Sequence, residues 1–201
     1  MTRRLFGFCL ILAFAVGLSL PTYADQWTNE KTWVIDYAKS KLSFTGKLAD
    51  GSSFNGLFKT FEAKIDFNPE IPDKGTINVT IDLDSVTTND AQRDGMLPQA
   101  EWFNIAKFPQ AKFVSEKIVV AGKDVDLNTV YEAHGQLLIK GFKQNVVLPF
   151  TLKQEGDVWH AKGSLRLRRT DYNVGEGQFA DEKTVKTVVT VDFDLIAKPN
   201  P

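Results

Sequence analysis

Hydrophobic and polar residues alternate along most of the chain beyond residue 24. The stretch 77–84 places Ile, Val, Ile and Leu at odd positions and Asn, Thr, Asp and Asp at even positions. A period of two gives a β-strand with one buried and one solvated face. The same alternation predicts further strands over residues 57–67, 131–139, 146–152, 159–169 and 185–195.

Turn residues separate these strands. Asp50-Gly51 and Gly156-Asp157 suit two-residue hairpins, in which the central positions favour positive φ. Longer connections at 69–75 and 122–129 contain Pro or Gly. We therefore expect neighbouring strands to be antiparallel.

One segment departs from the strand pattern. Asn89 to Gln92 is typical of a helix start, with a side-chain acceptor at the cap and Gln three residues later, and Pro98 ends the helix. A second short turn is expected over 99–104. The sequence thus predicts an antiparallel sheet with a short helical insertion.

About eight long strands, each with one apolar face, bury those faces by closing into a barrel or by packing as a sandwich. Strands of about ten residues favour the barrel. Bulky Phe61 and Ile65 and small Ala133 and Gly135 share the predicted inward face. Small inward residues are expected to leave space for a ligand inside the barrel.

The first 24 residues form a predicted signal peptide. Arg3 and Arg4 precede an apolar run from Leu5 to Leu20, and small residues precede a cleavage site after Ala24. The run is shorter than the roughly 20 residues of a membrane-spanning helix, which is the alternative. We expect export to the periplasm and one domain over residues 25–201.

Charge and residue usage exclude several classes of site. The 24 Lys and Arg balance 25 Asp and Glu, so no basic excess indicates a nucleic-acid partner. The single cysteine, Cys9, lies in the predicted signal peptide, so neither disulfides nor thiolate metal sites are expected in the exported chain. His134 and His160 occupy outward positions of their strands, so the sequence does not predict a histidine metal site.

Motifs over nearly the whole exported chain resemble the YceI-like family. No single short motif is decisive, but their order along the chain is specific. They are Trp33-Val34-Ile35-Asp36, Phe54-Asn55-Gly56-Leu57-Phe58, Phe67-Asn68-Pro69, Thr88 to Asp94, Glu101 to Asn104, Phe108 to Phe113, Gly135 to Gly141, Arg169 to Tyr172 and a final strand to Lys198.

The resemblance implies an all-β, lipocalin-like antiparallel barrel around an apolar tunnel. Its implied ligand is a polyisoprenoid or another long-chain amphiphile, such as a polyprenyl phosphate or an isoprenoid quinone. Some family members are joined to, or encoded beside, a membrane b-type cytochrome, which makes such a cytochrome a possible partner. No other cofactor is implied.

Arg169 is predicted to point inward, because it shares the parity of Leu165 and Leu167. Two interpretations remain open for a buried arginine. It forms an internal ion pair with Asp171, or it meets the head group of a ligand near the barrel mouth.

Arg93 of the helical insertion is either half of a surface pair with Asp94 or part of a mouth over the tunnel, together with Trp102, Phe103 and Phe108. These aromatics either plug the barrel end or contact the ligand.

The sequence predicts a non-catalytic lipid carrier. One alternative is a barrel enzyme that uses Asp171 and Arg169, another is a stress or adhesion module with a filled core, and a homodimer is possible. The predicted ligand-contacting residues are Phe61, Ile65, Arg93, Trp102, Phe103, Phe108, Ala133, Gly135, Leu137, Leu148, Phe150, Leu165, Leu167, Arg169 and Asp171.

Overall fold

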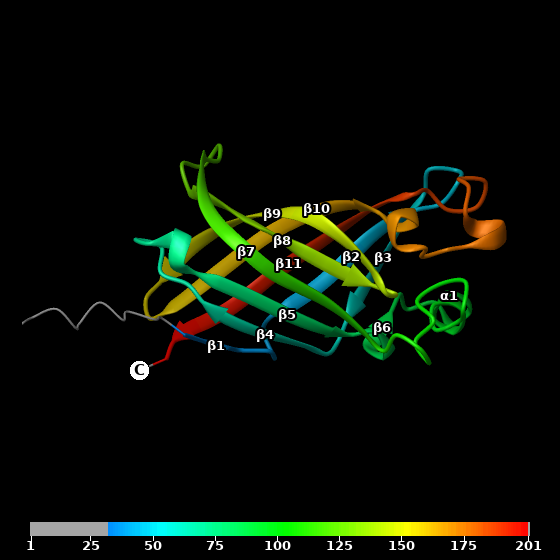
Figure 1. Ribbon diagram of the computed structural model, residues 1–201, viewed down its shortest axis with the longest axis horizontal. Coiled ribbons are helices and arrows are strands. Elements are labelled where there is room, and N and C mark those ends of the chain that lie inside the picture. The colour runs from blue at the N-terminus through cyan, green and yellow to red at the C-terminus, as the bar shows by residue number, and fades with distance from the viewer. Residues whose placement is uncertain (1–31, 201) are drawn as a thin grey trace, which may run out of the picture.

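Eleven strands of one sheet make up most of residues 32–200, the part of the chain that the computed structural model describes (Figure 1). The predicted signal peptide, residues 1–24, lies outside the described residues. The strands are β1 (Trp33–Ile35), β2 (Lys41–Lys47), β3 (Ser53–Phe58), β4 (Phe61–Asp66), β5 (Thr76–Asp82), β6 (Val86–Thr87), β7 (Gln110–Lys123), β8 (Thr129–Ile139), β9 (Phe142–Glu155), β10 (Val158–Arg168) and β11 (Val188–Pro199).

Helical structure is confined to the connections. The single α-helix among the described residues is α1 (Ala91–Met96), and it lies at one end of the barrel, here called the α1 end (Figure 1). Four 3-10 turns complete the elements of residues 32–200: η1 (Pro72–Lys74), η2 (Leu83–Ser85), η3 (Arg169–Tyr172) and η4 (Gly177–Phe179). The opposite end, which carries η1, is called the η1 end.

The strands follow the order β4-β5-β7-β8-β9-β10-β11-β2-β3-β6, and β1 pairs with β11. All the pairings are antiparallel, as predicted. An isolated bridge between Thr32 and Asp66 brings the start of β1 to β4. The sheet therefore curls into the predicted barrel, in which the two short strands β1 and β6 are added to nine longer ones.

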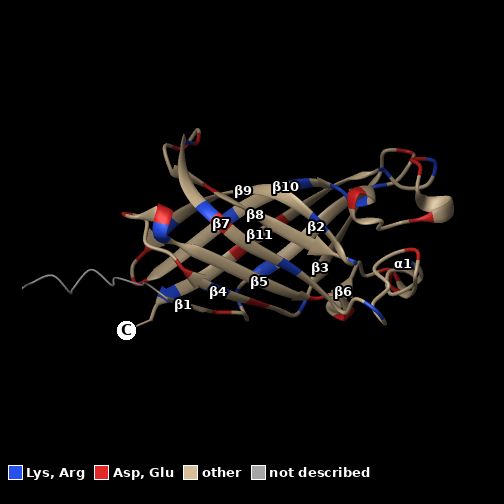
Figure 2. Cartoon of the chain, viewed as in Figure 1, with Lys and Arg blue, Asp and Glu red and all other residues tan. Residues whose placement is uncertain are grey.

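Alternation of apolar and polar residues explains which face is buried. On β11, Val191 pairs with Leu165 of β10 and with Phe44 of β2, and all three line the interior. Asp192 and Asp194 on the same strand face outward, and Lys162 Nζ lies 2.9 Å from Asp194. Figure 2 shows charges of both signs spread over the strands and loops.

The prediction of one strand over residues 57–67 was wrong. β3 ends at Phe58 and β4 begins at Phe61, and the two intervening residues change the phase of the alternation. Gly56 and Phe58 are buried on β3, whereas Leu57 pairs with Thr87 and Ser43 on the outer face. A period-two pattern cannot reveal such a break when apolar residues occur on both sides of it.

The helical insertion is confirmed, but its cap lies one residue later than predicted. The carboxylate of Asp90, not the side chain of Asn89, accepts hydrogen bonds from the amides of Gln92 and Arg93. Asp94 accepts from Thr87 and Thr88. The alternative of an Arg93–Asp94 pair is therefore wrong, because Arg93 instead pairs with Asp90 at 3.3 Å.

Small inward residues make room for neighbouring groups of the protein. Gly56 lies opposite Phe44, and Gly163 lies opposite Phe193. In each pair a Cβ on the glycine would overlap the facing aromatic ring. At Gly135 a Cβ would overlap the backbone of Val114, beside the irregularity between Ser115 and Lys117 of β7. The prediction that Gly135 leaves space for a ligand was therefore wrong.

The final strand has neighbours on both sides. β11 has β10 on one side and β1 and β2 on the other. The strand order ends at β4 and β6. At β4 the Tyr37 hydroxyl accepts a hydrogen bond from the Ala63 amide at 3.1 Å. Tyr37 also packs edge-on against Phe61.

Candidate ligand-binding cavity

An apolar cavity of about 230 Å³ runs through the barrel. Its walls come from almost every strand, and Arg169 is the one charged residue that lines it among the described residues. Trp33 and Trp159 line it at the η1 end, and Leu97 and Trp102 line it at the α1 end. This elongated apolar interior suits an alkyl or isoprenoid chain, because burial of apolar surface needs no specific polar partner.

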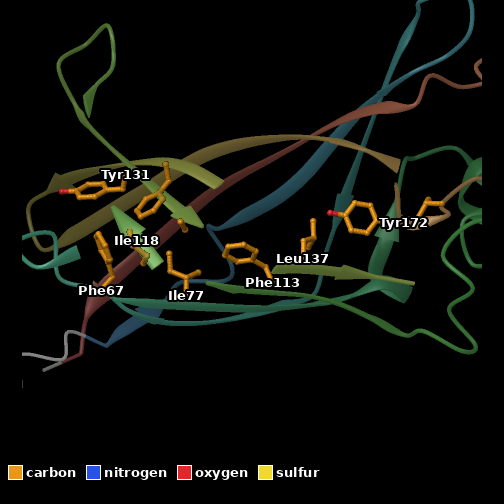
Figure 3. Packing of buried hydrophobic residues seen from close by; sticks show 10 residues of the cluster. Phe67, Ile77, Phe113, Ile118, Tyr131, Leu137 and Tyr172 are labelled. Atoms are coloured by element: carbon orange, nitrogen blue, oxygen red, sulfur yellow. The ribbon is translucent and has the colours of Figure 1, made fainter. Parts of the chain in front are cut away.

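Aromatic residues close the η1 end. The ring centroids of Trp33 and Trp159 are 5.5 Å apart in an edge-to-face arrangement. The indole of Trp33 donates to the Phe67 carbonyl at 2.8 Å. Phe67 in turn packs edge-on against Tyr131 (Figure 3) and also against Phe150. Opening this end would require several of these contacts to separate.

Loops close the α1 end. The segment that contains η3 and η4 packs against the turn that carries Trp102, and the Trp102 and Phe179 centroids are 5.0 Å apart. Lys140 is almost fully buried, and its ammonium donates to the Asn173 carbonyl at 2.7 Å and to Glu176 at 3.0 Å. These contacts fix the loop over the barrel mouth.

Arg169 anchors this loop. Its Nε donates to the carbonyl of Lys186, Nη1 to those of Val174 and Gly175, and Nη2 to those of Phe179, Asp181 and Val185. The residue is 3% exposed. Burial lowers the pKa of Arg169, and the negative charges of Glu182 and Asp181 oppose that effect. A guanidinium has five N–H donors, and backbone carbonyls occupy all of them.

Both predicted roles of Arg169 are therefore wrong, although its inward direction is confirmed. Asp171 is exposed and lies 3.7 Å from Arg168, so it forms no internal pair with Arg169. With its donors satisfied by the protein, Arg169 has none free for a head group. The alternative of a catalytic Asp171–Arg169 pair loses the arrangement on which it depended.

Tyr172 contributes a polar group to the cavity wall that was not predicted. The residue is 2% exposed, and its hydroxyl points along the interior toward Leu137 (Figure 3). Burial, together with the charge of Asp171, raises the pKa of Tyr172 to about 12. The phenol is therefore neutral at physiological pH and can donate one hydrogen bond to an oxygen inside the cavity.

Most of the predicted contact residues lie around the cavity. Those that line it are Phe61, Ile65, Trp102, Phe103, Leu137, Leu148, Phe150, Leu165, Leu167 and Arg169.

Five predicted residues do not line the cavity. Ala133 is fully buried in the surrounding core, and Gly135 faces the backbone of β7. Arg93 lies over the ring of Phe54, which itself lines the cavity. Phe108 packs beside Gly141 and under Lys107, and Asp171 is on the surface.

Sequence reasoning missed the aromatic residues of β2 and β3, namely Phe44, Phe54 and Phe58, which line the cavity. The alternation Leu42, Phe44, Gly46 contains the signal for these residues. Tyr172 gave a weaker signal, since η3 breaks the strand period at Arg169.

The histidines face outward, as predicted. His134 Nε2 lies 3.3 Å from Glu132 and His160 Nε2 lies 3.6 Å from Glu155, all on the outer surface. Within residues 32–200 no three His, Cys, Asp or Glu side chains are grouped so that they could hold a metal ion. Nor is any helix of this part of the chain long and apolar enough to cross a membrane.

Known proteins share this architecture. A crystal structure of Burkholderia cenocepacia BcnA is 33% identical, with a TM-score of 0.76 over 82% of this chain and 100% of that one. A polyisoprenoid binding domain from Saccharophagus degradans is 18% identical, with a TM-score of 0.65 over 85% of this chain and 99% of that one.

Comparison by sequence leads to the same group. Protein YceI of Salmonella arizonae is 29% identical over 96% of this chain and 97% of its own length. The family model described as a YceI-like domain matches residues 33–197, which is nearly the whole barrel. The chain therefore belongs to the YceI-like family, as the order of its sequence motifs indicated.

Proposed function

We propose that this protein binds the hydrocarbon chain of an isoprenoid lipid or a similar long amphiphile inside the barrel. The apolar cavity is the observation that carries the proposal, because a filled core would leave no space of about 230 Å³. Each buried methylene contributes roughly 0.8 kcal/mol, so a chain several carbons long needs few polar contacts to bind. The polyisoprenoid binding domain with the same fold supports this choice.

In this proposal, the polar head of the ligand carries an oxygen that accepts a hydrogen bond. Tyr172 offers a neutral donor inside the cavity, whereas the guanidinium of Arg169 is already bound to backbone carbonyls. A quinone carbonyl or an alcohol satisfies Tyr172 without placing a charge in an apolar site. We therefore favour a neutral isoprenoid, such as a quinone, over a polyprenyl phosphate held wholly inside.

In the cell the protein would act in the periplasm as a carrier or store of this lipid. The predicted signal peptide supports that location. A carrier of this kind would exchange its ligand with a membrane partner, for which a b-type cytochrome is one candidate. We propose no catalytic step, since the pair of residues that could have supplied one is not assembled.

Filling the cavity tests the proposal. Val191 lies on the cavity wall in the middle of β11, so Val191→Trp should occupy the space that the ligand chain would use. Thr190→Trp, one residue away on the outer face, is the matched control. Binding of a fluorescent isoprenoid probe and the thermal midpoint would be measured for both variants.

We expect Val191→Trp to lose probe binding while it keeps a cooperative thermal transition, and Thr190→Trp to bind as the unmodified chain does. Equal binding by the two variants would show that the ligand does not occupy the cavity. Native mass spectrometry of the unmodified chain adds a second readout, because a co-purified lipid appears as an extra mass.

A further inference from the structure

The wall of the barrel divides between β9 and β10. The pairing begins where Val158 of β10 faces Glu155 of β9, and it ends where Gly163 of β10 faces Phe150 of β9. β10 then continues along β11 as far as Arg168, and the first half of β9 continues along β8. The two strands separate toward the α1 end (Figure 1). We call this division, between residues 142–149 of β9 and 164–168 of β10, the fork.

Pro149 stands where the pairing stops. It is the next residue of β9 beyond the final pair with β10. Proline has no amide N–H, so it cannot donate to a neighbouring strand. The fork is therefore built into the sequence at this position.

Only side chains separate the interior from solvent at the fork. A surface pocket of about 440 Å³ lies over it, and both strands contribute to its walls. Leu165, Leu167 and Tyr172 line this pocket and also line the interior cavity. Both leucines are partly exposed, although they occupy inward positions of β10. Arg166, Arg168 and Asp171 form its polar outer rim.

Three other routes into the cavity cross bonded structure. A second surface pocket, near Lys39 and His160, shares Ile35 and Ala197 with the cavity. There, however, Ala197 pairs with Ile35 on one side and with Trp159 on the other, so the ladder is unbroken. Entry at the α1 end would separate Arg169 from its carbonyls, and entry at the η1 end would separate Trp33 from Phe67.

We propose that the fork is a side entrance through which an alkyl chain reaches the cavity, an inference that rests on the proposed lipid binding. Passage requires rotation of Leu165, Leu167 and Tyr172 and breaks no strand pairing. The hydrogen bond from the side-chain amide of Gln144 to the backbone carbonyl of Asp171, at 3.0 Å, closes the fork on the side of η3.

A covalent cross-link between the two strands of the fork tests whether it is the entrance. Val147 of β9 and Arg166 of β10 both face outward and line the surface pocket. If the register of the β9–β10 pairing continued into the fork, these two residues would lie opposite each other. In the full chain with Cys9→Ser, the pair Val147→Cys and Arg166→Cys would be joined by a short bis-maleimide.

The matched control joins Ser43→Cys to Asp192→Cys, which face each other on the outer side of a paired part of the wall, β2 and β11. Stopped-flow mixing with a fluorescent isoprenoid alcohol would measure association and dissociation before and after linking.

Linking the fork is expected to slow both association and dissociation by about tenfold or more, with Kd unchanged, because a closed route alters rates and not the bound state. Linking the control pair should leave both rates unchanged. Unchanged rates after the fork is linked would overturn the entrance while the binding function stands. Failure of the unlinked chain to bind the probe would overturn the binding function and the entrance together.

Discussion

The guanidinium of Arg169 lies over the ring of Trp102, with Cζ 5.8 Å from the ring centroid. A cation on an aromatic face is attracted by the π electrons, most strongly where water is excluded. The same guanidinium binds the carbonyls of the 174–186 segment, so one side chain joins the two loops that close the α1 end. Arg169 therefore lies beside the cavity because it holds these two loops together.

Replacing Arg169 should lower stability without changing head-group preference. Arg169→Met leaves six backbone carbonyls without their donor, and we expect a loss of about 3 kcal/mol or more in the free energy of unfolding. Denaturant unfolding measures this loss. Affinities for a polyprenyl phosphate and for the matching alcohol should fall together. A selective loss for the phosphate would return Arg169 to the ligand site.

The hydroxyl of Tyr172 should distinguish oxygenated ligands from hydrocarbons. Tyr172→Phe removes one neutral hydrogen bond, worth about 0.5 to 1.5 kcal/mol, which corresponds to roughly two- to twelvefold in affinity. Binding of an isoprenoid alcohol or quinone should weaken by this factor, and binding of the matching hydrocarbon should not. Because the pKa of Tyr172 is raised to about 12, the difference should be constant from neutral pH to pH 10. A difference that vanishes above pH 9 would contradict this assignment.

Gly135 should be intolerant of any side chain. A Cβ there would overlap the Val114 carbonyl, so Gly135→Ala should destabilise the protein by about 1 to 3 kcal/mol through forced backbone movement. Gly95 is the control, because a Cβ at that helical position meets nothing within 4 Å. Gly95→Ala should be neutral or should stabilise by up to about 1 kcal/mol. Thermal midpoints of the two variants, measured side by side, check the contrast.

Acid should weaken the loop that carries Glu182. Its carboxylate accepts from the Thr187 amide at 3.0 Å and hydroxyl at 2.7 Å, and these hydrogen bonds lower the pKa of Glu182 from 4.5 to about 2. A depressed pKa in the folded state means that the ionised form contributes stability above pH 4.5. This contribution is lost as the pH falls toward 2.

Glu182→Gln should therefore reduce the steepness of acid destabilisation between pH 4.5 and pH 2. Chemical denaturation at a series of pH values gives the slope. Glu116→Gln, at an exposed position on β7, is the control and should follow the unmodified chain. Parallel slopes for all three proteins would show that Glu182 does not stabilise the loop through its charge.

Alternation along the sequence predicted the walls of the cavity but not its polar groups. Leu148, Phe150, Leu165 and Leu167 were placed correctly because burial of one face fixes the direction of every second residue on a strand. The direction of Arg169 followed from the same rule. Its partners did not, because they belong to a loop that returns to the barrel mouth only in the folded chain.

Alternation along the sequence could not predict the surroundings of Gly135 or the outward direction of Leu57. A small inward residue signals close packing as well as open space, and the two cases differ only in which neighbouring group approaches. The phase change between β3 and β4 depends on how the chain crosses from one side of the barrel to the other, and pairing with β6 and β5 determines it.

The contact between the Tyr37 hydroxyl and the Ala63 amide has a consequence for solubility. An edge strand presents unpaired backbone groups that can recruit a strand from another molecule and so begin aggregation. Tyr37 occupies one such group at the middle of β4, and its ring covers Phe61 beside it. A tyrosine from the turn after β1 thus covers part of the β4 edge and hinders the pairing of that edge with a strand of another molecule.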